Sequence, residues 1–475
     1  MSLHIAIDLG ASNGRVIVGD EETFDVAHRF PTRWVAAGGN MFWDILDIFR
    51  EIKVGLKLAF NRYGSAITSI GVDSFGGGYA LLDQSGSLLQ NPFHYRDKRT
   101  DNIIDRLLES ISRREFYWET GAQFIRAGTF FQLFVHAQSC PDTLRAAKHF
   151  LMLPDLLNYW LTGRIANEYT IASMSQLMSL ENREWSRLLL ERIGVPFEPF
   201  GEIVMPGTIL GELRPDVCDE IEAPRDTTVI LAGCHDTACA FYAADKCLQK
   251  QDNHATALIS SGTWSLLGLI TEGPVINEAA FEHDLGNEGM VNGTNRLLKI
   301  ITGMWLVEEC RREWALEGVS YSNEELASLA EAESVPHFES IVDVNADLFV
   351  AAGKPADKMT NRIKAFCGDR GVAVPTTHQE IMSTIVRSIS AAYAEAIRHI
   401  EEASGVKIER ICVMGGGSRN RPLNRFTAQA TGLPVVLGPS EATALGNIIV
   451  QIEATGERLR LDKLRMFHGQ ESERR

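Results

Sequence analysis

Short apolar runs that end in glycine-containing polar turns recur along this chain. The first run, His4–Ile7, passes through a polar turn into the apolar segment Val16–Val18. The same order returns at Leu258–Ser260 and Trp264–Leu269, which flank a Gly-Thr turn. We expect a hairpin at each place, because β-forming residues surround a turn that glycine can close. Two hairpins of one design, one opening each half of the chain, indicate two lobes of similar build.

Helical periodicity lies between the strands. Asp44 is a suitable N-cap for apolar residues at helical spacing over Ile45–Phe60. The clearest helix is predicted at His378–Ala403, where apolar residues recur every three or four positions and Gly405 follows. Residues 101–190 are also predicted to be mostly helical. Strands that alternate with helices predict an α/β fold.

The expected division of the chain follows from its polar segments. Lys246–His254 lacks apolar periodicity, so it is the predicted linker between an N-terminal lobe at 1–245 and a C-terminal lobe at 246–475. Three glycines follow the expected strand Ile67–Ser74, and Tyr79–Leu82 with the turn Asp83–Gly86 completes a further expected hairpin. A proline at the start and a glycine at the end predict a helix at Phe150–Gly163.

Composition narrows the class of protein. The 475 residues are 45% hydrophobic and 23% charged, which is ordinary for a globular protein. The net charge of −16 argues against nucleic-acid or anionic-membrane partners, whereas a Mg-nucleotide stays open. The eight cysteines form no C-x-x-C pair, so we expect reduced, mostly buried thiols. No apolar run reaches the roughly 18 residues of a membrane span, and no basic leader is recognised. A soluble, cytoplasmic protein is expected.

Two aspartates at the exits of predicted strands are the candidate reactive groups. The strand Thr227–Leu231 leads into Gly-Cys-His-Asp-Thr, and ligands gather beyond the carboxyl ends of strands in open α/β sheets. Asp236 is therefore the candidate base for a substrate hydroxyl, ionised at neutral pH if its pKa stays near about 3.9. Asp8 would be placed to hold Mg²⁺ through water. The alternatives are an N-cap or turn role for Asp236 and an Asx-type turn at Asp8.

Glycine-rich turns are candidate phosphate sites, because their bare backbone amides can cradle phosphate oxygens. Gly10 and Gly14 open the first turn in this way. Near the C-terminus the strand Arg410–Met414 runs into three glycines, and Pro422 then begins a helix. A strand, a glycine-rich turn and a helix N-terminus form a ready nucleotide site. The spacings of the dinucleotide and P-loop motifs are absent from the sequence, which argues against both.

At this point the chain resembles the FGGY family of carbohydrate kinases, which have the two-lobed actin/hexokinase-like ATPase fold. The resemblance spans almost the whole chain in the family's order. It rests on Asp-Leu-Gly-Ala-Ser-Asn-Gly-Arg15, Tyr-Arg-Asp97, Leu-Pro-Asp155 with Leu-Thr-Gly163, Glu-Tyr-Thr170, His-Asp-Thr237, Ser-Ser-Gly-Thr-Trp-Ser265, Gly-Met-Trp-Leu306, Gly-Gly-Gly417 and Glu-Ala-Thr-Ala-Leu-Gly-Asn447.

The resemblance implies ATP-dependent phosphorylation of a sugar, usually a ketose, in a cleft between two lobes, each a mixed sheet flanked by helices. Asp236 would be the proton acceptor, and Asp8 and Asp236 would hold Mg²⁺. The implied sugar contacts are Gly76, Arg96, His235, Asp236 and Thr237. The implied nucleotide contacts are Ala11, Ser12, Asn13, Gly14, Arg15, Gly262, Thr263, Glu308, Gly415, Gly416, Gly417 and Asn420. A homodimer stays open as the assembly.

Two alternatives use the same residues differently. The same fold also serves ATPases that act on a protein partner, and these position water in place of a sugar. A hydrolase built on Cys234 and His235 is a third interpretation. It is disfavoured because neighbours on an extended chain point in opposite directions.

Within the family the chain is most similar to rhamnulokinases, with two departures on the substrate side. Gly78 stands where those kinases have a carboxylate, and Ile300 stands where they have an asparagine. A pocket that lacks two hydrogen-bonding partners should disfavour a hydroxyl at those positions. We therefore expect weak activity on L-rhamnulose and better activity on a related deoxyketose or a smaller ketose or polyol. Arg96 and His235 are the candidates to replace the lost contacts.

Overall fold

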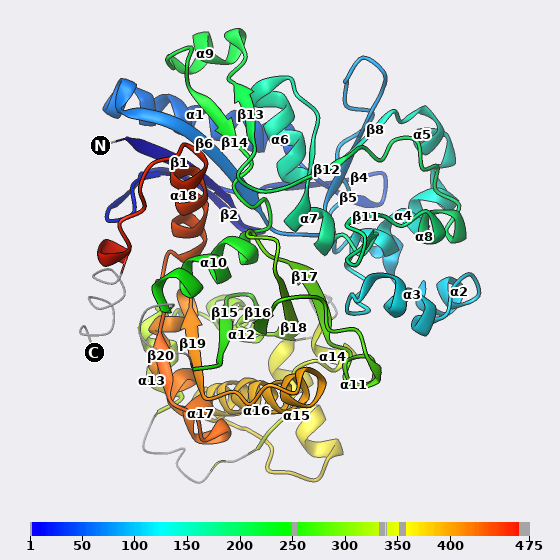
Figure 1. Cartoon of the computed structure of the whole chain (residues 1–475). Coiled ribbons are helices and arrows are strands. Elements are labelled where there is room, and N and C mark those ends of the chain that lie inside the picture. The colour runs from blue at the N-terminus through cyan, green and yellow to red at the C-terminus, as the bar shows by residue number, and fades with distance from the viewer. Residues whose placement is uncertain (1, 249–253, 332–337, 339, 351–357, 465–475) are drawn as a thin grey trace.

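The computed structural model describes residues 2–248, 254–331, 338, 340–350 and 358–464. Two lobes are stacked in Figure 1, each built on a six-stranded mixed sheet flanked by helices. The N-terminal sheet has the order β13-β14-β6-β1-β2-β3. Its strands are β1 (Leu3–Leu9), β2 (Asn13–Gly19), β3 (Phe24–Pro31), β6 (Ile67–Ser74), β13 (Ile209–Glu212) and β14 (Thr228–Ile230).

The C-terminal sheet has the order β17-β18-β16-β15-β19-β20. Its strands are β15 (Thr256–Ser261), β16 (Trp264–Thr271), β17 (Gly286–Gly289), β18 (Asn295–Thr302), β19 (Arg410–Met414) and β20 (Val435–Leu437). In both sheets an antiparallel hairpin, β1–β2 or β15–β16, has an antiparallel neighbour on one side, β3 or β18, and two successive parallel strands on the other, β6 and β14 or β19 and β20. The edge strands β13 and β17 pair antiparallel with β14 and β18. The expectation of two hairpins and two lobes of similar build is confirmed.

Helices cover the sheets of both lobes. Those of the first half are α1 (Ile45–Tyr63), α2 (Ile104–Leu108), α3 (Arg113–Thr120), α4 (Thr129–Ser139), α5 (Pro141–Ala146), α6 (Leu153–Thr162), α7 (Tyr169–Met174), α8 (Arg187–Arg192), α9 (Pro215–Ile221) and α10 (Asp236–Leu248). Those of the second half are α11 (Glu278–Glu282), α12 (Trp305–Leu316), α13 (Asn323–Leu329), α14 (Asp347–Val350), α15 (Met359–Asp369), α16 (His378–Ser404), α17 (Arg421–Thr431) and α18 (Ala442–Ala454).

The strongest helix signals in the sequence are confirmed. The side chain of Asp44 accepts the backbone N–H of Asp47 at the start of α1. A capping box of Thr377 and Glu380 opens α16, and Gly405 ends it in the left-handed conformation. In each case the capping residue and the apolar spacing specify the same element.

Four two-stranded sheets complete the described structure. They pair β4 (Trp34–Ala37) with β5 (Asn40–Trp43), β7 (Tyr79–Leu82) with β8 (His149–Met152), β9 (Asn167–Glu168) with β12 (Ile203–Val204), and β10 (Met178–Ser179) with β11 (Glu184–Trp185). The hairpin expected at Tyr79–Leu82 and the turn Asp83–Gly86 is confirmed as a short one, because Leu82 forms an antiparallel bridge with Leu88 and Leu89 donates its N–H to the carbonyl of Leu81 at 3.0 Å. The longer pairing of β7 is with β8, outside the main sheet. The helix expected at Phe150–Gly163 is shorter, since Phe150–Met152 belong to β8.

The lobes meet at α10 and α18, which pack against each other (Figure 1). Residues Lys246–Leu248 of the expected linker are the last turn of α10, and residues 249–253 lie outside the described residues. Although α18 belongs to the second half of the chain, it packs on β1 and β6 of the N-terminal sheet. Gly446 permits the close contact of α18 with α10, because a Cβ there would collide with the backbone of Cys239 in α10. A single boundary along the sequence does not describe this packing.

Buried polar contacts fix α18 on the N-terminal sheet. Gln451 donates to the carbonyl of Ile5 at 2.9 Å and accepts from the hydroxyl of Ser69 at 2.6 Å. Asn447 donates to the Asp73 carboxylate at 2.6 Å. Among the described residues, none of the helices has the length and apolarity that crossing a membrane would need. All eight cysteines are free thiols and seven are buried, as expected.

Candidate active site

Asp236 lies where β14 gives way to α10. We call Gly233–Asp236 the catalytic loop. The loop runs beside the end of β6, because Ser74, the last residue of β6, donates its N–H to the carbonyl of Cys234 at 2.9 Å. Gly233 has a φ of +129°, which a residue with a side chain rarely adopts. Asp236 is the first residue of α10, and its Oδ1 accepts the N–H and hydroxyl of Thr237 at 2.5 and 3.0 Å. Asp236 therefore both follows a strand and begins a helix, so the two positions considered from the sequence are compatible.

The environment of Asp236 changes the expected protonation. Burial raises the pKa of its carboxyl, repulsion from Asp8 raises it further, and His235 and Thr237 act in the opposite direction. The pKa therefore lies above the ordinary value that the sequence suggested. Exposure of 28% of the side chain leaves the carboxylate open to a ligand.

Asp8 ends β1 beside a second acid that the sequence analysis did not single out. Asp8 is in register with Asp73 on the parallel strand β6. Arg15 bonds both to Asp8 and to Glu441, which precedes α18, and so links the first hairpin to the last helix of the chain. Asp73 is fully buried, and burial together with the Asp8 charge raises its pKa. Asp73 could have been identified from the sequence in the same way as Asp8, because each lies near the end of a predicted strand.

The acids suit a magnesium ion that brings its own phosphate ligands. In the part of the chain that the structure describes, no three acidic, histidine or cysteine side chains form a ready metal cluster. Mg²⁺ needs no such cage, because it commonly binds one or two carboxylates together with waters and substrate phosphates. The charge of Asp8 raises the pKa of Asp236, so the two carboxylates belong to the same charged neighbourhood.

A cavity of about 270 Å³ lies between the lobes. It is lined by Arg15, Arg29, Ala240, Ser260, Gly415, Gly416, Arg419, Ser440, Glu441, Ala442 and Thr443. Three of the expected nucleotide contacts are in this lining, namely Arg15, Gly415 and Gly416. Arg29 and Arg419 add positive charge that suits an anion. The sequence analysis missed both: no motif surrounds Arg29, and Arg419 lies within the glycine-rich segment Gly415–Asn420 but was not itself singled out.

The other expected nucleotide contacts occupy the turns where they were predicted. Ala11, Ser12, Asn13 and Gly14 form or flank the β1–β2 turn, and Phe30 packs where a Cβ of Gly14 would lie. Gly262 and Thr263 form the exposed β15–β16 turn, and their carbonyls accept N–H groups at the start of α12 at 3.0 and 3.2 Å. Glu308 lies on α12 in an ion pair with Arg311. Gly417 packs against Ser261, and Asn420 caps α17.

On the sugar side, Arg96 reaches across the lobes. Its guanidinium lies 4.0 Å from the ring centroid of Trp305, at the start of α12. Gly76 packs against Met174, and a Cβ there would overlap the sulfur. Ile300 is half-buried on β18, and its N–H is bonded to Oε1 of Gln123 at 2.9 Å. Gln123 is another residue that no sequence motif identified.

Gly78 lies differently from the expectation. A Cβ at Gly78 would be 2.5 Å from Cδ1 of the fully buried Leu153. A side chain at this position would therefore enter the core of the N-terminal lobe. The expectation that a carboxylate here would meet the sugar is not supported by this geometry, so the half-buried Ile300 is the departure that remains.

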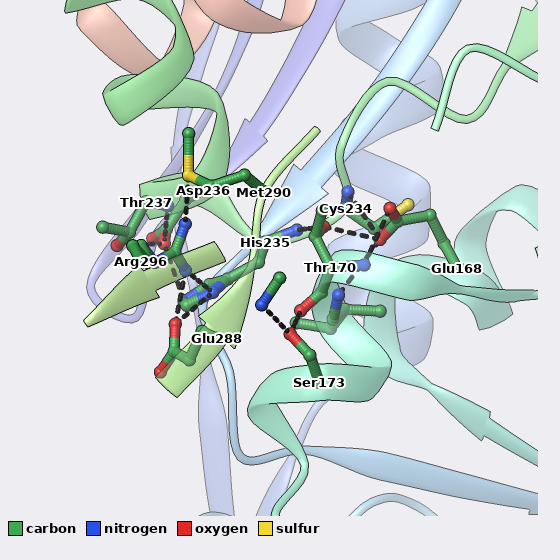
Figure 2. Close-up of polar contacts among 12 residues, drawn as sticks. Glu168, Thr170, Ser173, Cys234, His235, Asp236, Thr237, Glu288, Met290 and Arg296 are labelled. Atoms are coloured by element: carbon green, nitrogen blue, oxygen red, sulfur yellow. Dashed lines mark hydrogen bonds and ion pairs between the residues drawn. The ribbon is translucent and has the colours of Figure 1, made fainter. Parts of the chain in front are cut away.

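The catalytic loop separates the side chains of Cys234 and His235 (Figure 2). Cys234 is fully buried, lies 3.5 Å from the amide nitrogen of Asn158, and burial raises the pKa of its thiol. His235 instead contacts Glu288 and Arg296 of the other lobe. A buried neutral thiol without a histidine partner is a poor nucleophile, so the hydrolase interpretation is wrong.

Comparison with known proteins agrees with this geometry. The family model for the N-terminal domain of the FGGY family of carbohydrate kinases matches residues 3–242, and the C-terminal domain model matches residues 257–455. Rhamnulokinase from Bacteroides thetaiotaomicron is 40% identical over 456 residues, covering 95% of this chain and 90% of that protein. Rhamnulokinase from Oceanobacillus iheyensis is 37% identical over 455 residues, covering 95% and 93%.

Solved structures show the same fold at low sequence identity. Ligand-bound xylulose kinase from Lactobacillus acidophilus superposes with a TM-score of 0.78 at 14% identity, covering 98% of this chain and 92% of that one. Plasmodium falciparum glycerol kinase with ADP gives 0.76 at 15% identity, with the same coverage. The expected two-lobed fold is thereby confirmed. With both family models and relatives above 30% identity over nearly the whole chain, the protein belongs to the FGGY family of carbohydrate kinases.

Proposed function

We propose that this kinase transfers the γ-phosphoryl group of ATP to a hydroxyl of a ketose, with Asp236 as the base. The observation that carries the proposal is the position of Asp236, a partly exposed carboxylate at the joint between the lobes. Its oxygen would accept the hydroxyl proton as the sugar oxygen attacks the γ-phosphorus and ADP leaves. The alternative of an ATPase that acts on a protein partner finds no support among the matches.

Asp8, together with Asp236, would hold Mg²⁺; the support for this is that the charge of Asp8 acts on Asp236. When bound with ATP, this ion neutralises part of the phosphate charge. Arg15 holds the carboxylate of Asp8 in place, while Arg29 and Arg419 bring positive charge to the cavity between the lobes. Residues 1–245 would bind the sugar and supply the base, and residues 246–475 would bind most of the nucleotide. We also propose a cytoplasmic location, because the reaction consumes ATP.

The proposed class of sugar rests on the names of the relatives and on the apolar side chain of Ile300. The rhamnulokinases named above favour a ketose. The apolar Ile300 side chain offers no hydrogen bond to a sugar hydroxyl, so a ketose without a hydroxyl at that position should be preferred to L-rhamnulose. Gly76, Arg96, His235 and Thr237 remain the proposed sugar contacts.

The test is an ATP-consumption assay over ketoses and polyols, including L-rhamnulose, L-fuculose and L-xylulose, with the phosphorylated sugar identified directly. Asp236→Asn keeps the size of the side chain but removes the base, so kcat should fall at least about 100-fold while sugar binding is largely retained. Sugar-independent ATP hydrolysis without a phosphorylated sugar would contradict the proposed function. Near-normal kcat in a folded Asp236→Asn protein would contradict the role of Asp236.

A further inference from the structure

The catalytic loop is held by the N-terminal lobe through its backbone. The carboxylate of Glu168, at the start of α7, accepts the N–H of Cys234 at 3.0 Å. The hydroxyl of Thr170 accepts the N–H of His235 at 3.1 Å and donates to Glu168 at 2.7 Å. Figure 2 shows both residues on one side of the loop. These bonds position the main chain but leave the imidazole of His235 to be oriented by other groups.

The opposite side of the loop faces two charged residues of the C-terminal lobe (Figure 2). Glu288 on β17 and Arg296 on β18 are directly opposite each other in the antiparallel pair and form an ion pair. Nη2 of Arg296 lies 2.7 Å from Nδ1 of His235, and Oε2 of Glu288 lies 3.2 Å from the same nitrogen. Nε2 of the imidazole lies 3.4 Å from Oδ1 of Asp236.

The pair is buried and charged. The side chain of Arg296 is fully buried and that of Glu288 is 9% exposed. Burial alone would raise the pKa of Glu288, but the neighbouring Arg296 guanidinium acts against burial and is the largest cause that lowers this pKa. Two charges are kept out of water only where their geometry is well satisfied. Their burial against the catalytic loop therefore calls for an explanation.

The hydrogen-bond donors and acceptors around His235 explain why this ion pair is buried here. A guanidinium can donate hydrogen bonds but cannot accept them. If Nη2 of Arg296 donates to Nδ1 of His235, Nδ1 must carry a lone pair, and the proton of the neutral imidazole is then on Nε2. That N–H lies on the side of Asp236. Without Arg296, Glu288 alone would face Nδ1, and a carboxylate favours a proton there.

We propose that Arg296, held by Glu288, is a positioning residue that fixes His235 in the Nε2–H tautomer and directs this N–H toward Asp236 and the sugar hydroxyl. The inference rests on the proposed function for the identity of the ligand. Arg296 also touches α10, since its guanidinium lies 5.4 Å from the ring centroid of Phe241. The N–H of Gly289 bonds to the hydroxyl of Ser173 at 2.9 Å, which secures β17 on α7. The two lobes thus meet at His235.

The experiment compares Arg296→Met, which removes the donor, with Arg296→Lys, which keeps a charged donor. For Arg296→Met we expect kcat/KM for the sugar to fall about 10- to 100-fold, the range of a lost hydrogen bond to a charged group. KM for ATP should stay within about twofold, and Arg296→Lys should recover part of the loss. Glu313→Gln is the matched control, because Glu313 is a buried carboxylate that accepts the N–H groups of Met359 and Thr360 far from the loop.

A double-mutant cycle separates positioning from simple stability. In His235→Gln the amide can donate a hydrogen bond without help from Arg296, so adding Arg296→Met should cost little more activity. Equal losses in the wild-type and His235→Gln backgrounds, or a matching rise in KM for ATP, would overturn the proposal. If Arg296→Met does not fold, Glu288→Gln replaces it, and the same sugar-specific loss is expected.

A second readout does not depend on catalysis. The ¹⁵N chemical shifts of the His235 imidazole, identified by their loss in His235→Gln, should show a proton on Nε2 and a bare Nδ1 in the unliganded protein. A proton on Nδ1 would overturn the inference. A wild-type protein that phosphorylates no sugar but shows the expected shifts would instead count against the proposed function alone.

Discussion

We expect Gly78→Asp to destabilise the N-terminal lobe and to leave the choice of sugar unchanged. A Cβ at Gly78 would lie 2.5 Å from Cδ1 and 2.8 Å from Cγ of Leu153, a side chain with no exposed surface. Either Leu153 or the backbone must move, and overpacking of this kind costs about 1–3 kcal/mol. Gly78→Ala measures that cost alone. The carboxyl group of Gly78→Asp adds a buried polar head without a designed partner, which costs about 1–3 kcal/mol more.

Thermal unfolding provides the measurement. For a lobe of this size, 1 kcal/mol shifts Tm by about 2–4 °C, so a 2 kcal/mol loss in Gly78→Ala should lower Tm by about 4–8 °C. Gly78→Asp should lower it further. Gly273 offers the control, because a Cβ there meets no atom within 4 Å and its φ is not left-handed. Gly273→Ala and Gly273→Asp should change stability by no more than about 0.5 kcal/mol. An unchanged Tm in Gly78→Asp, together with a shifted sugar preference, would refute the placement of Gly78 in the core.

Three further predictions concern the site itself. Asp8→Ala should raise KM for Mg-ATP and leave the calorimetric binding of sugar alone unchanged; an unaltered Mg²⁺ dependence would reduce Asp8 to a turn residue. Because burial raises the pKa of Asp236, kcat/KM should fall as the pH drops through that raised pKa, and the residual activity of Asp236→Asn should lack this acid limb. Ile300→Asn should raise kcat/KM for L-rhamnulose relative to L-xylulose by about 2- to 10-fold, the value of one hydrogen bond; an unchanged ratio in a rate assay would show that position 300 does not touch the sugar.

The elements that the sequence predicted are those with local signals. The hairpins β1–β2 and β15–β16 join neighbouring segments through turns that glycine permits, and α16 carries its own capping box and apolar stripe. The motif around Asp236 could also be found, because the candidate base stands directly after a strand. In each case the residues that specify the structure lie within one stretch of chain.

The features that the sequence did not predict depend on contacts between distant residues. Nothing near Tyr79–Leu82 indicates that β7 pairs with a strand at His149–Met152. Glu288 and Arg296 are opposite charges on two short strands, a pattern that is usually found on a solvated surface. The contact between the two lobes is what buries this pair against His235. Gly78 shows the converse, since its place in a glycine-rich turn suggested access to a ligand and its Cβ direction leads into the core.

The charge of the site explains how an acidic protein can bind an anionic nucleotide. The chain carries a net charge of −16, and Asp8, Asp73, Asp236 and Glu441 gather near the joint between the lobes. Asp73 is fully buried, and burial with the charge of Asp8 raises its pKa, which favours the neutral form of this carboxyl. Arg15 is bonded to two of the remaining carboxylates and cannot neutralise a triphosphate as well. Counter-charge for ATP must therefore come from arginines along the cavity wall, from the backbone amides of the turns and from a divalent cation. The proposed magnesium ion would in this way offset the acids that the proposed chemistry needs.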